Sequence, residues 1–236
     1  MKTENTSPNR TAKYAALLHL ALAVLSGFSF MGVDNRILVE GNAAATAHNV
    51  AAMDGLIRVG LIANLAGQAI FLFLAHALYK LLSPVDKGLA RLMVILVVAS
   101  VPIAFLNSLN QLAAVQLLGQ STSLAAFTTT QLQALAMVFL KLQFLGTMIA
   151  QVFWGLWLFP FGLLVYRSGF LPRFVGVLLM LGCFGYLADS FLAFTFPALS
   201  AYAAPGIWVS AIAELSFIFW VLIRGIKIKT FSKEST

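Results

Sequence analysis

Two carboxyl groups, Asp189 and Glu214, lie inside long apolar segments of this sequence, where ionisable side chains are rare. Such a group faces the interior of a helical bundle by default, where it can bind a ligand or exchange a proton when water or a solute arrives. The alternative is a neutral carboxyl that ties helices together through a hydrogen bond worth about 1 kcal/mol. Both residues are therefore candidate ligand-binding residues, and the structural alternative stays open.

Four polar residues each lie sixteen positions from the Lys or Arg that ends their own apolar segment. At a rise of about 1.5 Å per residue they reach roughly 24 Å from those bases, in the outer half of a hydrocarbon core about 30 Å thick. Gln68 and Glu214 reach roughly 18 and 15 Å from their own bases. Asn110 lies three residues after Asn107, on the same face of its helix. This spacing predicts a polar cavity that opens outward. Its hydrogen-bonding walls would be Asn64, Gln68, Asn107, Asn110 and Gln151, and its charged floor Asp189 and Glu214.

Two basic residues could form the rim of that cavity. Lys141 interrupts the apolar run "MVFLKLQFLG" and lies 26 residues before Arg167, or roughly 39 Å along a straight helix, which reaches the outer headgroups. Its ammonium could extend to that interface, or it could turn inward to pair with Asp189 or an anionic ligand. Arg58, at the outer start of the second apolar segment, has the same two options.

Catalytic and cofactor signatures are missing from the sequence. It contains no HExxH, no GxSxG nucleophile elbow, no P-loop and no Gly-rich dinucleotide fingerprint. His19 and His76 fall near the cytoplasmic ends of adjacent helices, but no carboxylate or Cys joins them at that depth, so ordinary core or interfacial histidines are favoured over metal or haem ligands. We therefore expect no catalytic residue, no metal site and no cofactor, and rank an intramembrane enzyme acting on lipid third.

The elements that must position these residues are membrane helices. The 236-residue chain is 61% hydrophobic and 10% charged, with a mean hydropathy of +0.92, which is typical of an integral membrane protein. Its net charge of +7 comes from bases scattered over short loops, which argues against nucleic acid as a partner. The lipid bilayer is the expected partner, and the single cysteine, Cys183, cannot form an intrachain disulfide.

Segments of about twenty apolar residues predict an all-α bundle of six transmembrane helices. Assigning the bases to loops gives twelve on one side and two on the other, so the positive-inside rule predicts cytoplasmic termini. Residues 1–13 and 227–236 would be cytoplasmic tails around a transmembrane domain at 14–226. The six predicted spans are 14–33, 57–79, 90–117, 135–166, 174–197 and 205–224.

The connections on the outer side are longer than simple turns. Residues 34–58 are Ala-rich enough for a short surface helix, and residues 119–133 suggest a helix start at their threonines. Both segments are either lids over the bundle or connectors. Asn107-Ser108 and Asp189-Ser190 follow their cytoplasmic bases at matching distances, so helices 2–3 and 4–5 suggest a hairpin pseudo-repeat, although generic hairpins would mimic it.

Four motifs, "GNAAATAHNV", "PIAFLNSLNQLAA", "AQVFWGLWLFPFGLLVYRSGFLPR" and "GYLADS", occur in this order along the chain. Together they resemble the bacterial membrane proteins of domain-of-unknown-function family 4386, over about Lys13 to Lys227. The resemblance implies a multi-pass protein of a bacterial inner membrane and carries no activity or substrate.

The sequence therefore favours a protein that binds or translocates a small polar or amphipathic solute. The alternative is a structural or partner-binding membrane subunit in which the polar layer only fixes helix packing. Six helices are few for a monomeric transporter, so a homodimer stays open.

Overall fold

The computed structural model describes residues 8–119 and 124–226, and within these ranges the chain is helical and contains no strand. The predicted tail at 227–236 lies outside the described residues, as do residues 1–7 of the other tail, while residues 8–13 already belong to the first helix. The elements in chain order are α1 (Pro8–Gly27), η1 (Phe28–Asp34), α2 (Asn35–Ile37), α3 (Ala43–Ala52), α4 (Asp54–Leu82), α5 (Lys87–Leu118), α6 (Thr129–Ser168), α7 (Arg173–Thr195), η3 (Pro197–Ala203) and α8 (Ala204–Arg224).

Six of these stretches are long and apolar enough to cross a membrane, which confirms the predicted all-α fold with six spanning helices. The first crossing is continuous from Pro8 to Ile37, because α1 runs through η1, a π-helical stretch, into α2. It is therefore longer than predicted at both ends. α6 is also longer, and its 40 residues span roughly 60 Å, about twice the thickness of the hydrocarbon core.

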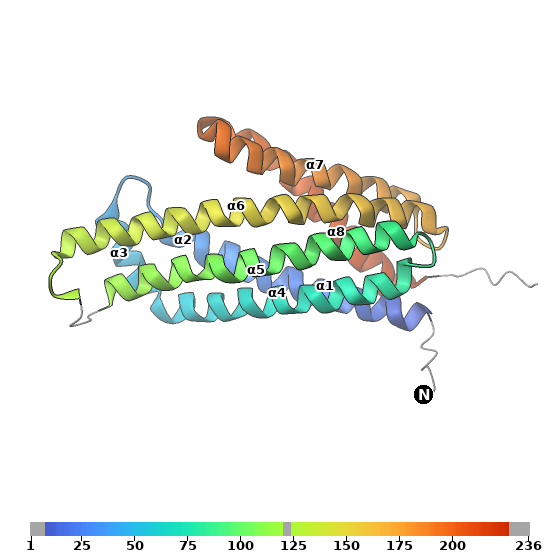
Figure 1. Ribbon diagram of the computed structural model, residues 1–236, viewed down its shortest axis with the longest axis horizontal. Coiled ribbons are helices and arrows are strands. Elements are labelled where there is room, and N and C mark those ends of the chain that lie inside the picture. The colour runs from blue at the N-terminus through green and yellow to red at the C-terminus, as the bar shows by residue number, and fades with distance from the viewer. Residues whose placement is uncertain (1–7, 120–123, 227–236) are drawn as a thin grey trace, which may run out of the picture.

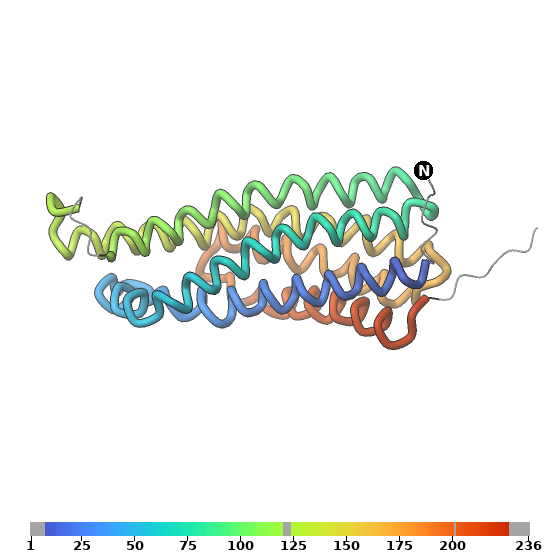
Figure 2. Tube along the Cα trace, turned by 90° about the horizontal axis from the view of Figure 1, so that it is seen from below, coloured from blue at the N-terminus to red at the C-terminus, as the bar shows by residue number. Residues whose placement is uncertain are grey.

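The spanning helices run side by side along the long axis of the molecule (Figures 1 and 2), and their contacts close a ring in chain order. Each spanning helix packs on the next, and α8 returns to α1. α1 begins and α8 ends at the same end of the molecule, which also holds the bases of the α4–α5 and α6–α7 connections; we call it the basic end. The other end carries α3, and we call it the α3 end. At the basic end, the backbone N–H of Ile226 donates to the side chain of Asn9 (3.1 Å).

The core is largest in the half of the bundle nearer the basic end. Trp157 and Phe161 of α6 are stacked, with centroids 5.1 Å apart, and Phe217 of α8 packs edge-on against Phe161. All three side chains are fully buried. Helices approach closely here because glycines face one another: a Cβ on Gly162 would meet the backbone of Gly176 at 2.6 Å. Small residues commonly allow such contacts between membrane helices.

The predicted short helix in residues 34–58 is confirmed as α3. Asn42 caps it by accepting a hydrogen bond from the backbone N–H of Ala45 (2.9 Å). The Thr46 hydroxyl accepts from the backbone N–H of Val39 (3.0 Å), which ties the preceding loop to the helix. The predicted helix start near residue 130 is confirmed too, since Thr128 and Gln131 form a capping box at the beginning of α6.

Candidate functional site

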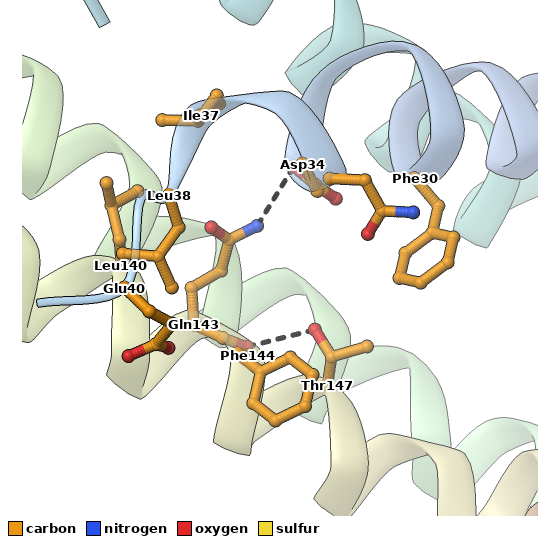
Figure 3. Close-up of a pocket in the computed structure, with 10 residues that line it drawn as sticks. Phe30, Asp34, Ile37, Leu38, Glu40, Leu140, Gln143, Phe144 and Thr147 are labelled. Carbon is orange, nitrogen blue, oxygen red and sulfur yellow. Dashed lines mark hydrogen bonds between the residues drawn. The ribbon is translucent and has the colours of Figure 1, made fainter. Parts of the chain in front are cut away.

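A pocket of about 240 Å³ opens near the α3 end, between the end of the first crossing and one face of α6 (Figure 3). Positions 140, 143, 144 and 147 of α6 have the spacing that places residues on one helix face. The facing side is formed by η1, α2 and the segment that follows them. The lining residues are Phe30, Asp34, Asn35, Ile37, Leu38 and Glu40 on that side, and Leu140, Gln143, Phe144 and Thr147 on α6.

Two carboxylates line this pocket, Glu40 at the exposed rim and Asp34 deeper inside. Asp34 is the last residue of the π-helical stretch, a rare conformation that occurs frequently at functional sites. The side chain is half-buried, and its Oδ1 accepts hydrogen bonds from Nε2 of Gln111 (3.0 Å) and of Gln143 (3.4 Å). Among the described residues, Oδ2 accepts no hydrogen bond and no Lys or Arg pairs with the carboxylate. One oxygen is thus available to a donor that enters the pocket.

Two asparagines of α5 hold the wall of the pocket from behind. Nδ2 of Asn107 donates to the backbone oxygen of Gln143 (2.8 Å) and to the hydroxyl of Thr147 (3.1 Å). Nδ2 of Asn110 donates to Oδ1 of Asn107 (3.1 Å). Asn107 can approach α6 this closely because residue 146 is a glycine, and a Cβ there would collide with Oδ1 of Asn107. The asparagines therefore fix the α6 face that lines the pocket.

The remaining lining is mostly apolar, with an ion pair at the rim. Phe30 and Phe144 lie on opposite sides of the opening in Figure 3, with Leu140 further along α6. Glu40 pairs with Lys141 at 3.2 Å, and the two side chains are 74% and 48% exposed. The ammonium of Lys141 is thus directed to the surface and forms no ion pair with Asp189. The pocket thus combines the half-buried carboxylate of Asp34 with a mostly apolar wall.

A second polar group lies deeper in the bundle, between α6 and α7. Nε2 of Gln151 donates to Oδ2 of Asp189 (2.7 Å) and lies 3.2 Å from the hydroxyl of Ser190. The same amide is 3.3 Å from the backbone oxygen of Tyr186. The Ser190 hydroxyl donates to the backbone oxygen of Met148 (3.1 Å). These contacts join the two helices directly.

A third group joins the first and last helices. Nε2 of His19 lies 2.8 Å from Oε2 of Glu214, and the Tyr186 hydroxyl donates to Oε1 of Glu214 (3.2 Å). His19 is 1% exposed and packs among the rings of Trp157, Phe161 and Phe217 at centroid distances of 5.9 to 6.5 Å. A titratable pair therefore occupies the aromatic core.

Comparison with known proteins identifies the family. The family model described as domain of unknown function DUF4386 matches residues 14–225. The chain belongs to this family. An uncharacterised protein from the archaeon Archaeoglobus fulgidus is 30% identical over 156 residues, which is 65% of this chain and 76% of the relative. No solved structure matches. The resemblance drawn from the sequence motifs is confirmed, and sequences similar to this one are not confined to bacteria.

The nine residues predicted to bind a ligand in this DUF4386 protein do not form one site, and none of them lines the pocket around Asp34. Their ligand-binding roles stay predictions. Asn107 and Asn110 support the pocket; Gln151, Asp189 and Glu214 belong to the deeper groups; Lys141 and Arg58 form surface ion pairs with Glu40 and Asp54; Gln68 is buried on α4; and Asn64 is half-buried on α4.

Sequence reasoning missed the partners that complete these groups: Asp34, Gln143, Thr147, Tyr186 and His19. The expectation that no carboxylate joins His19 at its depth was wrong, because it was counted from Lys13 although α1 begins at Pro8. Counted from the helix ends, His19 lies eleven residues from Pro8 and Glu214 ten residues from Arg224, which brings them level. The prediction places Asp34 in the outer connection at residues 34–58, because the apolar run ends at Val33, whereas the first crossing continues to Ile37.

Proposed function

We propose that this DUF4386 protein binds a small amphipathic solute in the pocket between η1 and α6, with the donor groups of the solute against Asp34. The observation that carries the proposal is the state of that carboxylate. It is half-buried, it has no basic partner among the described residues, and its Oδ2 accepts no hydrogen bond from them. A carboxylate oxygen that lacks a protein donor at the wall of a pocket can accept a hydrogen bond from a ligand.

The size and lining of the pocket support a small solute with one apolar side. Its volume of about 240 Å³ is below the range of roughly 300–1,000 Å³ that is common for drug-sized ligands. Asp34, Gln143 and Thr147 offer acceptors and a donor, while Phe30 and Phe144 offer aromatic surface. A carboxylate with no cation beside it favours an amine over an anion. The proposed solute is therefore a small amine with an apolar body.

The sequence supplies the proposed orientation. With the basic end in the cytoplasm, as the positive-inside rule predicts, the pocket would face the outer side of a prokaryotic plasma membrane. Solute binding would then begin from outside. Translocation, if it follows, would lead from Asp34 toward the deeper groups around Asp189 and Glu214.

The test uses three matched probes: benzylamine, benzyl alcohol and benzoate. We expect titration calorimetry on protein in nanodiscs to give saturable binding of benzylamine, weaker binding of the alcohol and none of benzoate, after subtraction of empty nanodiscs. Asp34→Asn should weaken benzylamine at least about tenfold, because the charge is lost while the amide keeps a similar shape. Asp54→Asn is the control, since that carboxylate is exposed and paired with Arg58. Equal benzylamine affinity in Asp34→Asn and the unaltered protein would contradict the proposal.

A second candidate is a structural or partner-binding membrane subunit, and one observation favours it: Gln151 and Asp189 pair directly at 2.7 Å, as interhelical contacts do. Asp189→Ala separates the two proposals. A large fall in melting temperature with benzylamine binding unchanged would assign Asp189 to stability alone. A loss of benzylamine binding at an unchanged melting temperature would extend the solute site into the bundle.

A further inference from the structure

A second titratable site lies in the half of the bundle nearer the basic end, and the proposed solute pocket does not use it. His19 comes from α1 and Glu214 from α8, and their side chains meet at 2.8 Å. The imidazole is 1% exposed and the Glu214 side chain 20%. Neither residue lines the pocket around Asp34. The pair is thus a separate centre, joined to α7 through the hydroxyl of Tyr186.

The charge of the pair depends on how many protons it holds. With one proton shared between imidazole and carboxylate the pair is neutral overall; with none it carries one negative charge. A buried charge without a partner is costly inside a membrane, so the singly protonated pair is favoured. The deprotonated pair is still within reach, because Glu214 then accepts hydrogen bonds from Nε2–H of His19 and from the Tyr186 hydroxyl.

Among the described residues, the groups around the pair are aromatic or neutral except for two titratable side chains of α7, Tyr186 and Asp189. α6 contributes Trp157 and Phe161, and α8 contributes Phe217 besides Glu214. α7 contributes Tyr186, with Asp189 one turn further on and hydrogen-bonded to Gln151. α4 presents Phe71 and neutral Gln68, whereas His76 of α4 is exposed on another face. No Lys or Arg in the described ranges pairs with either member.

The other ring nitrogen, Nδ1 of His19, is buried and has no hydrogen-bond partner in the part of the chain that the structure describes. Two more buried atoms share this condition, Oε1 of Gln68 and Nε1 of Trp154. Phe71 and Trp157 pack at 5.0 Å, and Gln68 and Trp154 lie three residues before them on helices that run the same way. His19 packs on Trp157 at 5.9 Å, so the three unpaired atoms come from helices that meet at the same aromatic cluster, with Gln68 and Trp154 about one turn closer to the α3 end.

These three atoms have complementary chemistry. The Gln68 oxygen accepts, the Trp154 N–H donates, and Nδ1 of His19 does either according to its protonation. A water molecule among them could donate to Gln68 and accept from Trp154, as internal waters do for otherwise unpaired groups. It could also accept from Nδ1–H or donate to bare Nδ1. Both protonation states of His19 would thus find a partner on this side.

We propose that His19 and Glu214 form a proton-binding site in which the proton enters and leaves at Nδ1 of His19. In the protonated state the imidazolium donates from Nε2 to Glu214 and carries its second N–H at Nδ1. On release the Nδ1–H bond breaks, the proton passes to water, and the neutral imidazole keeps Nε2–H on Glu214. No electron is transferred and no other covalent bond changes.

Nitrogen NMR on the full chain in nanodiscs tests this site. Protein labelled with 15N-histidine and carrying His48→Gln and His76→Gln retains His19 alone as a signal. Across pH 5 to 9 we expect the Nδ1 resonance to move from the protonated to the unprotonated position while Nε2 stays protonated. A constant Nδ1 resonance over this range, or release of the proton from Nε2, would overturn the proposal.

Variants assign the partner. Glu214→Gln should lower the proton affinity of His19 at least about tenfold, because the carboxylate charge is removed. If Glu214→Gln does not fold, Tyr186→Phe is the second variant. It removes the hydroxyl that donates to Glu214, which should raise the proton affinity of His19 roughly two- to tenfold, as expected for the loss of one hydrogen bond. Asp54→Asn, an exposed carboxylate paired with Arg58 on the first turns of α4, is the matched control and should leave it unchanged. An unchanged midpoint in both Glu214→Gln and Tyr186→Phe would refute the assignment. None of these results depends on benzylamine binding.

Discussion

At the scale of single residues, the polar groups of this DUF4386 protein differ in their surroundings. Asp34 and Asp189 each accept amide donors at one oxygen only among the described residues, but Asp34 lines a pocket whereas Asp189 lies between α6 and α7, 2.7 Å from Gln151. Buried polar groups are normally paired, and the exceptions call for a reason. That reason, in our proposals, is a solute at Asp34 and a proton at His19.

Gly146 offers a direct test of how the pocket wall is supported. Gly146→Ala places a Cβ against Oδ1 of Asn107, and overpacking of this kind typically costs about 1–3 kcal/mol. We expect a lower melting temperature in detergent and weaker benzylamine binding. Gly55→Ala on α4 is the matched control, because its Cβ would meet open space and alanine is the better helix former. If both variants melt alike, the contact between Asn107 and α6 does not stabilise the protein.

Residue-level prediction from the sequence succeeded where depth alone decided the outcome. Lys141 reached the surface, as its distance from Arg167 indicated, and ends 3.2 Å from Glu40. Prediction failed where the direction in which a side chain faces decides its partner. Asn107 and Gln151 share a calculated depth, yet Asn107 contacts the pocket wall and Gln151 contacts Asp189. Composition and spacing give height in the bundle and leave the facing direction to side-chain packing.

At the scale of elements, α6 organises the molecule. It contributes the face that lines the pocket, Gln151 in the middle, and Trp157 and Phe161 in the aromatic core. The sequence predicted its excess length but could not predict the π-helical stretch η1, since no residue type specifies an i to i+5 turn. That turn lets the first crossing continue to Ile37 and sets Asp34 beside Gln111 and Gln143.

The start of α6 gives a prediction about local stability. Thr128→Ala removes the hydroxyl that accepts from the backbone N–H of Gln131 (3.3 Å), and loss of such a cap costs about 1 kcal/mol. We expect faster hydrogen exchange in the first turn of α6. The exchange of the core turn around Trp157 should stay as it was. Thr130→Ala keeps both bonds of the capping box and should behave as the unaltered protein; equal protection in the two variants would argue against the cap.

The packing of α6 on α7 gives a prediction about global stability. Gly162→Ala would drive its Cβ to 2.6 Å from the backbone oxygen of Gly176, and backbone cannot yield as a flexible side chain does. The helices must separate, so we expect a fall in melting temperature larger than for Gly146→Ala, where a side chain can turn away. A melting curve for each in the same detergent decides the order, and the reverse order would show that α7 shifts freely.

At the scale of the whole molecule, the distribution of bases predicts which end faces the cytoplasm. In a Cys183→Ser background, a cysteine introduced at Ala44 on α3 should react with a membrane-impermeant maleimide in intact cells. A cysteine at Lys87, exposed at the basic end, should react only after permeabilisation. The opposite labelling pattern would place the termini outside and turn the pocket around Asp34 toward the cytoplasm.

The contact between Asn9 and Ile226 brings the first and last helices together, so the ring of helices is closed. A closed ring has no helix that must come first in the chain. Each spanning helix touches the next, and the last touches the first, so a chain opened between α5 and α6 and joined across the basic end would rebuild the same neighbours. Circular permutation is therefore a practical route to a version whose new ends lie at the α3 end, on the helix that lines the pocket, where a fluorescent reporter could be fused to follow solute binding.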